Sequence, residues 1–206
     1  MLSRRSWLAI VPVAGLSASL PARARAAAVV EAAAANKAVG ALVAATGGDA
    51  VRVVIDAGLA PTQLRLDGAV VDIGQRIRLP GDPKADRRFL DDPRNAPRLG
   101  GNIRDAIASR HPELAAKVND NHKAWTRSIA RQIMDWNRQL ESSKVKGQAI
   151  ADAYGRAALL VWAGATIDPK SANRGPASLA RLPEEPSAAT LAAYGAYVEA
   201  LIAAVR

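Results

Sequence analysis

The clearest hydrophobic pattern lies in the middle of the chain and predicts one long helix from about Pro112 to Ser142. Its apolar residues recur at spacings of three, four or seven: Leu114, Val118, Trp125, Ile129, Ile133, Trp136 and Leu140. Such a stripe is typical of the buried face of an amphipathic helix, here of about eight turns. Pro112 suits a first helical turn, and Glu113 complements the positive end of the helix dipole.

The opposite side of this helix carries Lys123, Arg127 and Arg131 at four-residue spacing. A basic row of this kind could bind an anion, but it is more often the solvated face of a helix. We therefore expect these three side chains to be exposed.

Weaker patterns before the long helix predict strands and a second helix. Residues 51–55 indicate a short strand, and residues 70–73 and 76–79 are weaker strand candidates. Leu99, Ile103 and Ile107 then give the buried face of a helix that ends at His111. Residues 27–35 look helical by residue propensity, whereas a strand fits the resemblance described below, and we favour the strand.

After the long helix, the apolar run 159–165 fits either a buried strand or the end of a helix that starts near residue 150. Residues 169–186 are rich in Pro, Ser, Gly and Asn and predict a loop. A final helix is expected over 187–205. Alanine is abundant and aromatic residues are scarce, which favours a helix-rich domain. Together with the resemblance described below, the order of predicted segments gives the fold class α/β.

The first 26 residues have the pattern of an export signal. Arg4-Arg5 precede an apolar run over residues 7–20, and Ala24-Arg25-Ala26 offers a small-x-small cleavage pattern. The order resembles a twin-arginine signal, with an ordinary Sec signal as the alternative. The run is too short to span a membrane, which takes about 20 residues. Cleavage would give a periplasmic protein without stable membrane insertion.

Removal of this signal also changes the charge argument. It contains four arginines and no acids, so cleavage lowers the net charge from +9 to +5. The remaining basic excess is spread along the chain, and an exported protein rarely meets nucleic acid, so we expect no nucleic-acid partner. The absence of cysteine excludes disulfides and thiolate metal sites.

The order of several motifs resembles the extracytoplasmic solute-binding proteins of zinc and manganese ABC transporters. Residues 89–96 (FLDDPRNA) are similar to the family's HVWLDPRNA, and residues 55–62 (IDAGLAPT) to VPPGADPH. Residues 152–155 (DAYG) are similar to DAFG, and residues 185–191 (EPSAATL) to EPSAADL. The segment 103–125 corresponds to the family's helix, turn and linking helix. The resemblance covers nearly all of the chain after the signal.

The resemblance implies a reduced two-lobe fold with a short parallel sheet and a long linking helix. Residues 27–111 would form a reduced first lobe, 112–142 the linking helix and 143–206 an incomplete second lobe. About 30 family residues after Thr62 have no counterpart in this chain. A possible partner is an ABC permease or another periplasmic protein.

The family's metal ligands, three histidines and a carboxylate, are replaced here. Carried over by position, the histidines fall on Thr62, Arg88 and Ala151, and the late carboxylate has no counterpart. Threonine is a poor ligand, alanine is none, and a protonated arginine repels a cation. The resemblance therefore implies that the family metal site is lost and that no cofactor is bound. Arg88 could instead attract a small anion.

No other residues form a convincing metal or catalytic site. His111 and His122 are expected to have local structural roles. Asp91 and Asp92, with Asp82 and Asp86, could bind a hard cation, but nearby basic residues favour a capped helix start with surface ion pairs. Glu184 and Glu185 lie between prolines in a loop, without a visible partner that would tune their pKa. No nucleophile motif or catalytic pair is present, so no enzymatic activity is expected.

Three functions remain open at this stage. The first is a solute-binding-type component of a metal-uptake system whose own site is lost. The second is a non-transport interaction or scaffold protein of the periplasm. The third is a remnant that binds no ligand.

Overall fold

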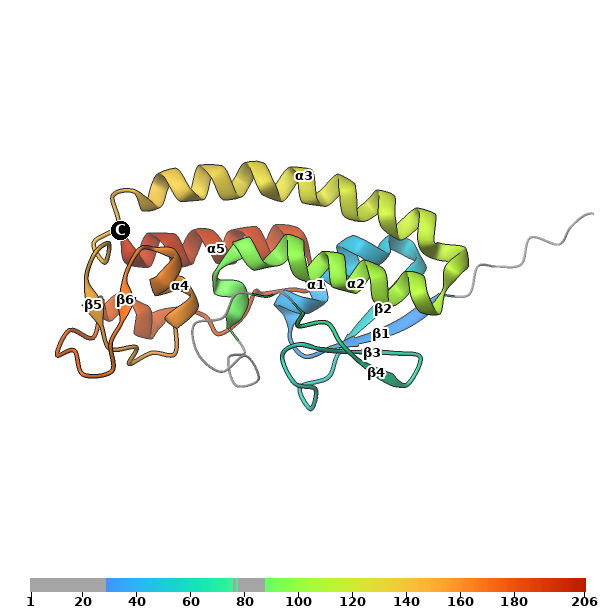
Figure 1. Cartoon of the computed structure of the whole chain (residues 1–206), viewed down its shortest axis with the longest axis horizontal. Helices are drawn as coiled ribbons and strands as arrows, with labels where there is room; N and C mark the ends of the chain where they lie inside the picture. Colours follow the sequence, from blue (N-terminus) through green and yellow to red (C-terminus); the bar gives the residue numbers. More distant parts are fainter. Residues whose placement is uncertain (1–28, 76, 78–87) are drawn as a thin grey trace, which may run out of the picture.

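The computed structural model describes residues 29–75, 77 and 88–206, and its longest element is helix α3, Ala115–Leu140. A short 3-10 turn, Pro112–Leu114, leads into α3, and the helix then runs unbroken along the length of the molecule (Figure 1). Five residues of the predicted stripe are buried and two are half-buried: Val118, Trp125, Ile129, Trp136 and Leu140, with Leu114 and Ile133. The predicted long helix is confirmed.

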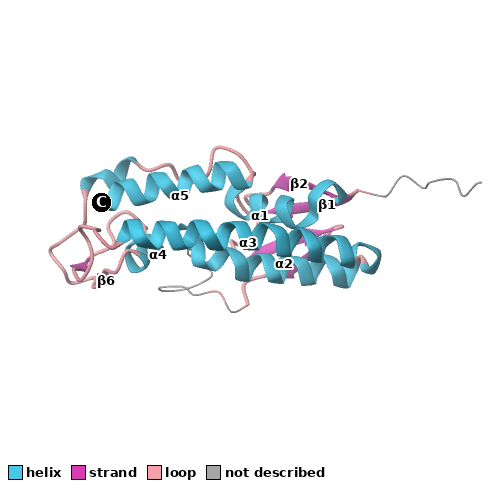
Figure 2. Cartoon of the chain, turned by 90° about the horizontal axis from the view of Figure 1, so that it is seen from above, coloured by secondary structure: helices cyan, strands magenta, loops and turns pink. Residues whose placement is uncertain are grey.

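The basic row on α3 is exposed at all three positions, Lys123, Arg127 and Arg131. This agrees with the expected solvated face. The apolar stripe on the other side of α3 packs against helices α1 (Lys37–Gly47), α2 (Ala96–Arg110) and α5 (Leu191–Val205), as Figures 1 and 2 show. Helix α3 therefore forms a shared wall for elements from both ends of the described chain.

The main sheet has four strands in the order β2-β1-β3-β4. Its strands are β1 (Val30–Ala34), β2 (Val51–Ile55), β3 (Gln63–Leu66) and β4 (Ala69–Asp72). The strand favoured over 27–35 is confirmed as β1, and the strands expected near 51–55 and 70–73 are confirmed as β2 and β4. The candidate 76–79 falls mostly outside the described residues.

The expectation of a parallel sheet is wrong for two of the three strand pairings in the main sheet. Strands β1 and β2 are parallel, but β3 is antiparallel to β1 and β4 is antiparallel to β3. The physical reason for the antiparallel pairing of β3 and β4 is the turn Asp67-Gly68, where both residues have left-handed backbone (φ 47° and 81°). Two such residues form the tight turn that joins antiparallel strands, and Asp-Gly is a preferred pair for it. This local signal identifies the hairpin and the unpredicted strand β3.

Helices α1 and α2 cover one face of this sheet (Figure 1), where Ala32, Ala34, Leu64 and Leu66 are buried. Val54 and Val70 are exposed because they point to the other face. The alternation follows from the two-residue period of a strand.

Close packing between α2 and α3 explains why α2 contains Gly100, although a glycine lowers the intrinsic stability of a helix. A Cβ atom on Gly100 would lie 2.1 Å from the Trp125 ring, so no larger residue fits there. The Trp125 indole also donates a hydrogen bond to the Thr46 hydroxyl at 3.2 Å. Trp125 therefore determines how closely α1 and α2 pack against α3.

The remainder of the chain, residues 143–206, forms smaller elements at the other end of α3 (Figure 1). Strands β5 (Ala149–Ile150) and β6 (Thr166–Ile167) are parallel, and helix α4 (Ala157–Trp162) lies between them in sequence. The apolar run 159–165 is thus mainly the end of a helix, which starts at Ala157 rather than near residue 150. The final helix starts at Leu191, because the Thr190 hydroxyl caps it by accepting from the Ala193 N–H.

Candidate functional site

The three residues that the resemblance aligns with metal ligands, Thr62, Arg88 and Ala151, lie in different local environments. Thr62 is buried before β3, and its carbonyl accepts a hydrogen bond from the Ile73 N–H at 2.8 Å. Ala151 follows β5 and is half-buried, with its N–H bonded to the Asn173 carbonyl. Arg88 immediately precedes the 3-10 turn Phe89–Asp91. Of the three, Arg88 reaches from the N-terminal part (residues 29–111) to the C-terminal part (residues 143–206).

The Arg88 guanidinium contacts three acceptors of the C-terminal part. Its Nη1 donates to the Tyr154 carbonyl at 2.8 Å and to the Gly155 carbonyl at 3.3 Å. Its Nη2 lies 3.1 Å from Oε1 of Glu184. The Arg88 side chain is 25% exposed, whereas that of Glu184 is 86% exposed. The arginine therefore lies at the junction of the two parts with a carboxylate already beside it.

A second arginine, Arg156, forms a buried cluster at the same junction. Its Nη1 donates to Asp91 Oδ2 at 2.9 Å and to the Tyr197 hydroxyl at 2.8 Å. The Tyr197 hydroxyl in turn donates to Asp91 Oδ1 at 2.5 Å, and Nη2 of Arg156 donates to the Pro183 carbonyl. Both charged side chains are 2% exposed. The expectation of surface ion pairs is therefore wrong for Asp91, which finds its partner in a distant segment.

The electrostatics of this cluster keep its protons in place. Burial alone would lower the pKa of Arg156, but the charge and hydrogen bond of Asp91 raise the pKa above its ordinary value. Burial, followed by the nearby Asp91 charge, raises the pKa of Tyr197 and Tyr194 well above the ordinary value for tyrosine. The arginine stays charged and both phenols stay neutral, so the cluster is suited to structure rather than to proton transfer.

The loop Pro183–Pro186 reaches the N-terminal part through two adjacent acids. Glu184 contacts Arg88, while the carboxylate of Glu185 accepts from the Lys37 N–H at 3.1 Å and lies 3.2 Å from Lys37 Nζ. Glu185 thus caps the first turn of α1, where a negative charge is favourable. Both acids thus have basic partners that could not be seen from the sequence, because Arg88 and Lys37 are distant from them along the chain.

The two histidines have the local roles expected of them. The ring of His111 lies 2.7 Å from Asp67 and 3.4 Å from Glu113 at the α2–α3 junction. His122 packs edge-on against Trp125, and its Nε2 is 3.3 Å from the Pro97 carbonyl. Burial lowers the pKa of His122, which favours the neutral ring.

Within residues 29–75, 77 and 88–206, no three His, Cys, Asp or Glu side chains gather where they could hold a metal ion. Asp92 accepts from the Arg94 N–H and forms an ion pair with the Arg94 side chain, as expected of a helix-start residue. Asp82 and Asp86, the other two acids considered for a cation site, lie outside the described residues.

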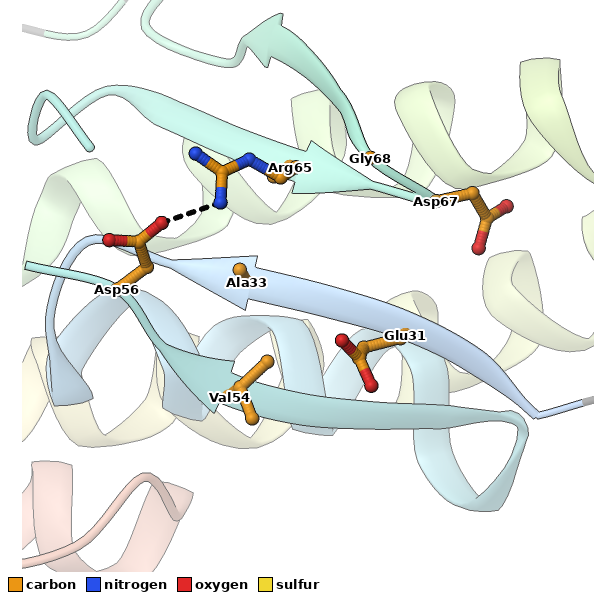
Figure 3. A pocket seen from close by; sticks show the side chains of 7 residues that line it. All are labelled: Glu31, Ala33, Val54, Asp56, Arg65, Asp67 and Gly68. Carbon is orange, nitrogen blue, oxygen red and sulfur yellow. Dashed lines mark hydrogen bonds and ion pairs between the residues drawn. The ribbon is translucent and has the colours of Figure 1, made fainter. Parts of the chain in front are cut away.

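A shallow pocket lies on the open face of the main sheet, as Figure 3 shows. It is lined by Glu31, Ala33, Val54, Asp56, Arg65, Asp67 and Gly68. Two of its acids pair with arginines, Glu31 with Arg52 and Asp56 with Arg65 at 2.7 Å, and the ring of His111 lies 2.7 Å from Asp67. The pocket is therefore a mixed polar surface around two small apolar side chains.

Sequence comparison finds no match to a family model or to a curated protein. Among solved structures, the chain is similar to the Zn(II)-bound ZnuA-like domain of AdcA from Streptococcus pneumoniae, with TM-score 0.50 and 15% identity over 73% of this chain and 71% of that chain. Zn(II)-bound AdcA from the same organism has TM-score 0.48 and 14% identity, covering 73% of this chain and 41% of that one. The metal-dependent lipoprotein YcdH of Bacillus subtilis has TM-score 0.48 and 14% identity, covering 82% and 74%.

The first of these similarities supports a reduced solute-binding-protein-like fold, α/β and helix-rich. Identity this low bears on the fold and leaves ligand and activity open. Every helix of the described residues is too short or too polar to cross a membrane.

Proposed function

We propose that this protein is an exported, solute-binding-protein-like component related to zinc or manganese ABC transport, and that its own metal site is lost. Residues 27–111 and 143–206 are then the reduced first and incomplete second lobes, joined by the linking helix 112–142. In this proposal the protein acts through its surface beside a permease or another periplasmic protein.

The observation that carries the proposal is the placement of Arg88. A site for Zn²⁺ needs about four donor atoms at roughly 2.0 to 2.2 Å for nitrogen and oxygen ligands. The position that aligns with the second histidine instead holds a guanidinium that contacts two carbonyls and a carboxylate. A fixed positive charge there opposes entry of a divalent cation.

Two other functions fit parts of the structure less well. A small-anion site at Arg88 would require an anion to displace the carboxylate of Glu184. A non-transport scaffold is favoured by the open sheet face, which exposes Val54 and Val70. The scaffold function shares with the main proposal the prediction that metal is not bound.

Calorimetry on the tag-free mature protein tests the loss of the metal site. We expect no stoichiometric heat with Zn²⁺ or Mn²⁺ at micromolar concentrations. The proposal would be contradicted by micromolar zinc binding that a substitution of Thr62 weakens and that His111→Gln and His122→Gln leave unchanged. Binding lost in either histidine variant would place any zinc site elsewhere in the chain.

Export is tested separately by the mass of the protein in the periplasmic fraction. Cleavage after Ala26 gives a chain that begins at Ala27. Changing Arg4 and Arg5 together to lysine should retain the precursor inside the cell if the twin-arginine route is used. Normal export of that variant would assign the signal to the Sec route.

A further inference from the structure

We propose that the C-terminal part contains a binding site for a planar guanidinium cation, which the protein fills with its own Arg88. The site consists of the carbonyl oxygens of Tyr154 and Gly155 and the carboxylate of Glu184, and we call these three groups the cradle. This inference goes beyond the proposed transport function and depends only on the geometry of the junction.

The chemistry of the cradle selects for a guanidinium group. It offers two carbonyl oxygens and a carboxylate, so it accepts hydrogen bonds from a ligand. The cradle has two sides, a carbonyl wall formed by Tyr154 and Gly155 and a carboxylate wall formed by Glu184. Of the two terminal nitrogens of Arg88, Nη1 faces the carbonyl wall and Nη2 faces the carboxylate wall. A rigid fork spans such a pair of walls, whereas the single ammonium group of a lysine is a point charge.

Gly155 gives the cradle its shape. Its φ of 62° is in the left-handed region that side chains rarely adopt. A Cβ atom built on it would also lie 3.1 Å from Nη1 of Arg88. Glycine is therefore needed both for the turn of the backbone and for the close approach of the cation.

Contacts that do not involve Arg88 hold the backbone next to both walls of the cradle. Next to the carbonyl wall, the Arg156 N–H donates to Asp152 Oδ1 at 2.7 Å, and the Arg156 side chain is fixed in the buried cluster. Next to the carboxylate wall, Pro183 accepts from Arg156 and Glu185 caps α1. The backbone of the cradle should therefore stay folded when Arg88 is shortened, although its amides should open more often, and this leaves a preformed site for a free cation.

Chemical rescue tests this inference in the mature protein. We expect Arg88→Ala to bind methylguanidinium saturably at millimolar concentrations, followed by NMR shifts of the amides of residues 153–156. The wild-type protein should bind at least tenfold more weakly, because its own side chain occupies the cradle. Methylammonium at the same ionic strength should bind at least tenfold more weakly than methylguanidinium.

Arg52→Ala is the matched control, because Arg52 is an exposed arginine paired with one carboxylate, Glu31, on the main sheet. It should show no saturable methylguanidinium binding near Glu31. Adding Glu184→Gln to Arg88→Ala should weaken the binding severalfold. Equal binding to the wild-type protein and Arg88→Ala, or to Arg52→Ala and Arg88→Ala, would overturn the proposal.

Arg88→Lys guards against a loss of folding in the alanine variant. It keeps the positive charge but loses the fork, so amide hydrogen exchange at residues 153–156 should be faster than in the wild type. Unchanged exchange in Arg88→Lys would also overturn the inference, since a charge alone would then suffice. These outcomes do not depend on zinc binding, so the cradle and the loss of the metal site can fail separately.

Discussion

Arg88 and Arg156 connect the same two parts of the chain, but they do so in opposite environments. Arg156 and its partner Asp91 are each 2% exposed, and the buried Tyr197 hydroxyl bonds to both of them. Arg88 is 25% exposed and its acidic partner Glu184 is 86% exposed. The comparison indicates that the contribution of an ion pair at this junction to stability depends strongly on its access to water.

The physical basis of this difference is the cost of an unpaired charge. Water can solvate Glu184 when its partner is removed, but it has little access to Asp91. We therefore expect the buried Arg156–Asp91 pair to be required for the packing of the two parts, and the exposed Arg88–Glu184 pair to affect only the local structure at their junction. Four substitutions test this contrast.

The largest effect is expected for Arg156→Ala. The change leaves Asp91 buried without its cation, which should lower the free energy of unfolding by about 3–5 kcal/mol. Denaturant unfolding at pH 7 measures it. Arg52→Ala is the control, because Arg52 and its partner Glu31 are 69% and 56% exposed, and it should cost less than about 1 kcal/mol. Equal losses in the two variants would remove the basis of the comparison.

Tyr197→Phe should have the next largest effect. The Tyr197 hydroxyl bonds to both Asp91 and Arg156, so its removal leaves charged groups short of a partner at a cost of about 1–3 kcal/mol. Tyr194→Phe on the same helix is the control, since its hydroxyl bonds to one carbonyl, that of Leu90. Thermal unfolding should rank Tyr197→Phe as the more harmful. The reverse order would show that the charges do not strengthen the cluster.

Glu185→Gln should have a smaller effect, about 0.3–1 kcal/mol at low ionic strength, because it removes a charge at the first turn of α1 but keeps an acceptor. Added salt should reduce the difference from the wild type, which unfolding at two salt concentrations can measure. Glu199→Gln, on the exposed side of α5, should be neutral. A salt-independent loss would point to packing rather than to the helix dipole.

The smallest effect on global stability is expected for Glu184→Gln, below about 1 kcal/mol, because Glu184 is almost fully exposed. The same substitution should still loosen the junction locally, so hydrogen exchange at Tyr154 and Gly155 should accelerate while global unfolding hardly changes. A global loss as large as that of Arg156→Ala would mean that the exposed pair is as obligatory as the buried one.

The sequence by itself determined the elements whose signal is local. The stripe from Leu114 to Leu140 predicted α3 because the helical period is written into consecutive residues. The expectation that Thr62, Arg88 and Ala151 stand at the family's histidine positions also came from the sequence, through the resemblance, and it remains a prediction. The Asp67-Gly68 hairpin also has a local sequence signal, but it was overlooked because the family resemblance implied a parallel sheet.

Only the tertiary structure decided which polar residues are buried and paired. Asp91 and Arg156 are 65 positions apart, and Lys37 and Glu185 are 148 apart, so no spacing rule connects them. Gly100 weakens a helix in sequence terms, yet Trp125 makes it necessary. The physical reason is that periodicity depends on neighbours along the chain, whereas the cost of burying a charge depends on partners that folding brings together.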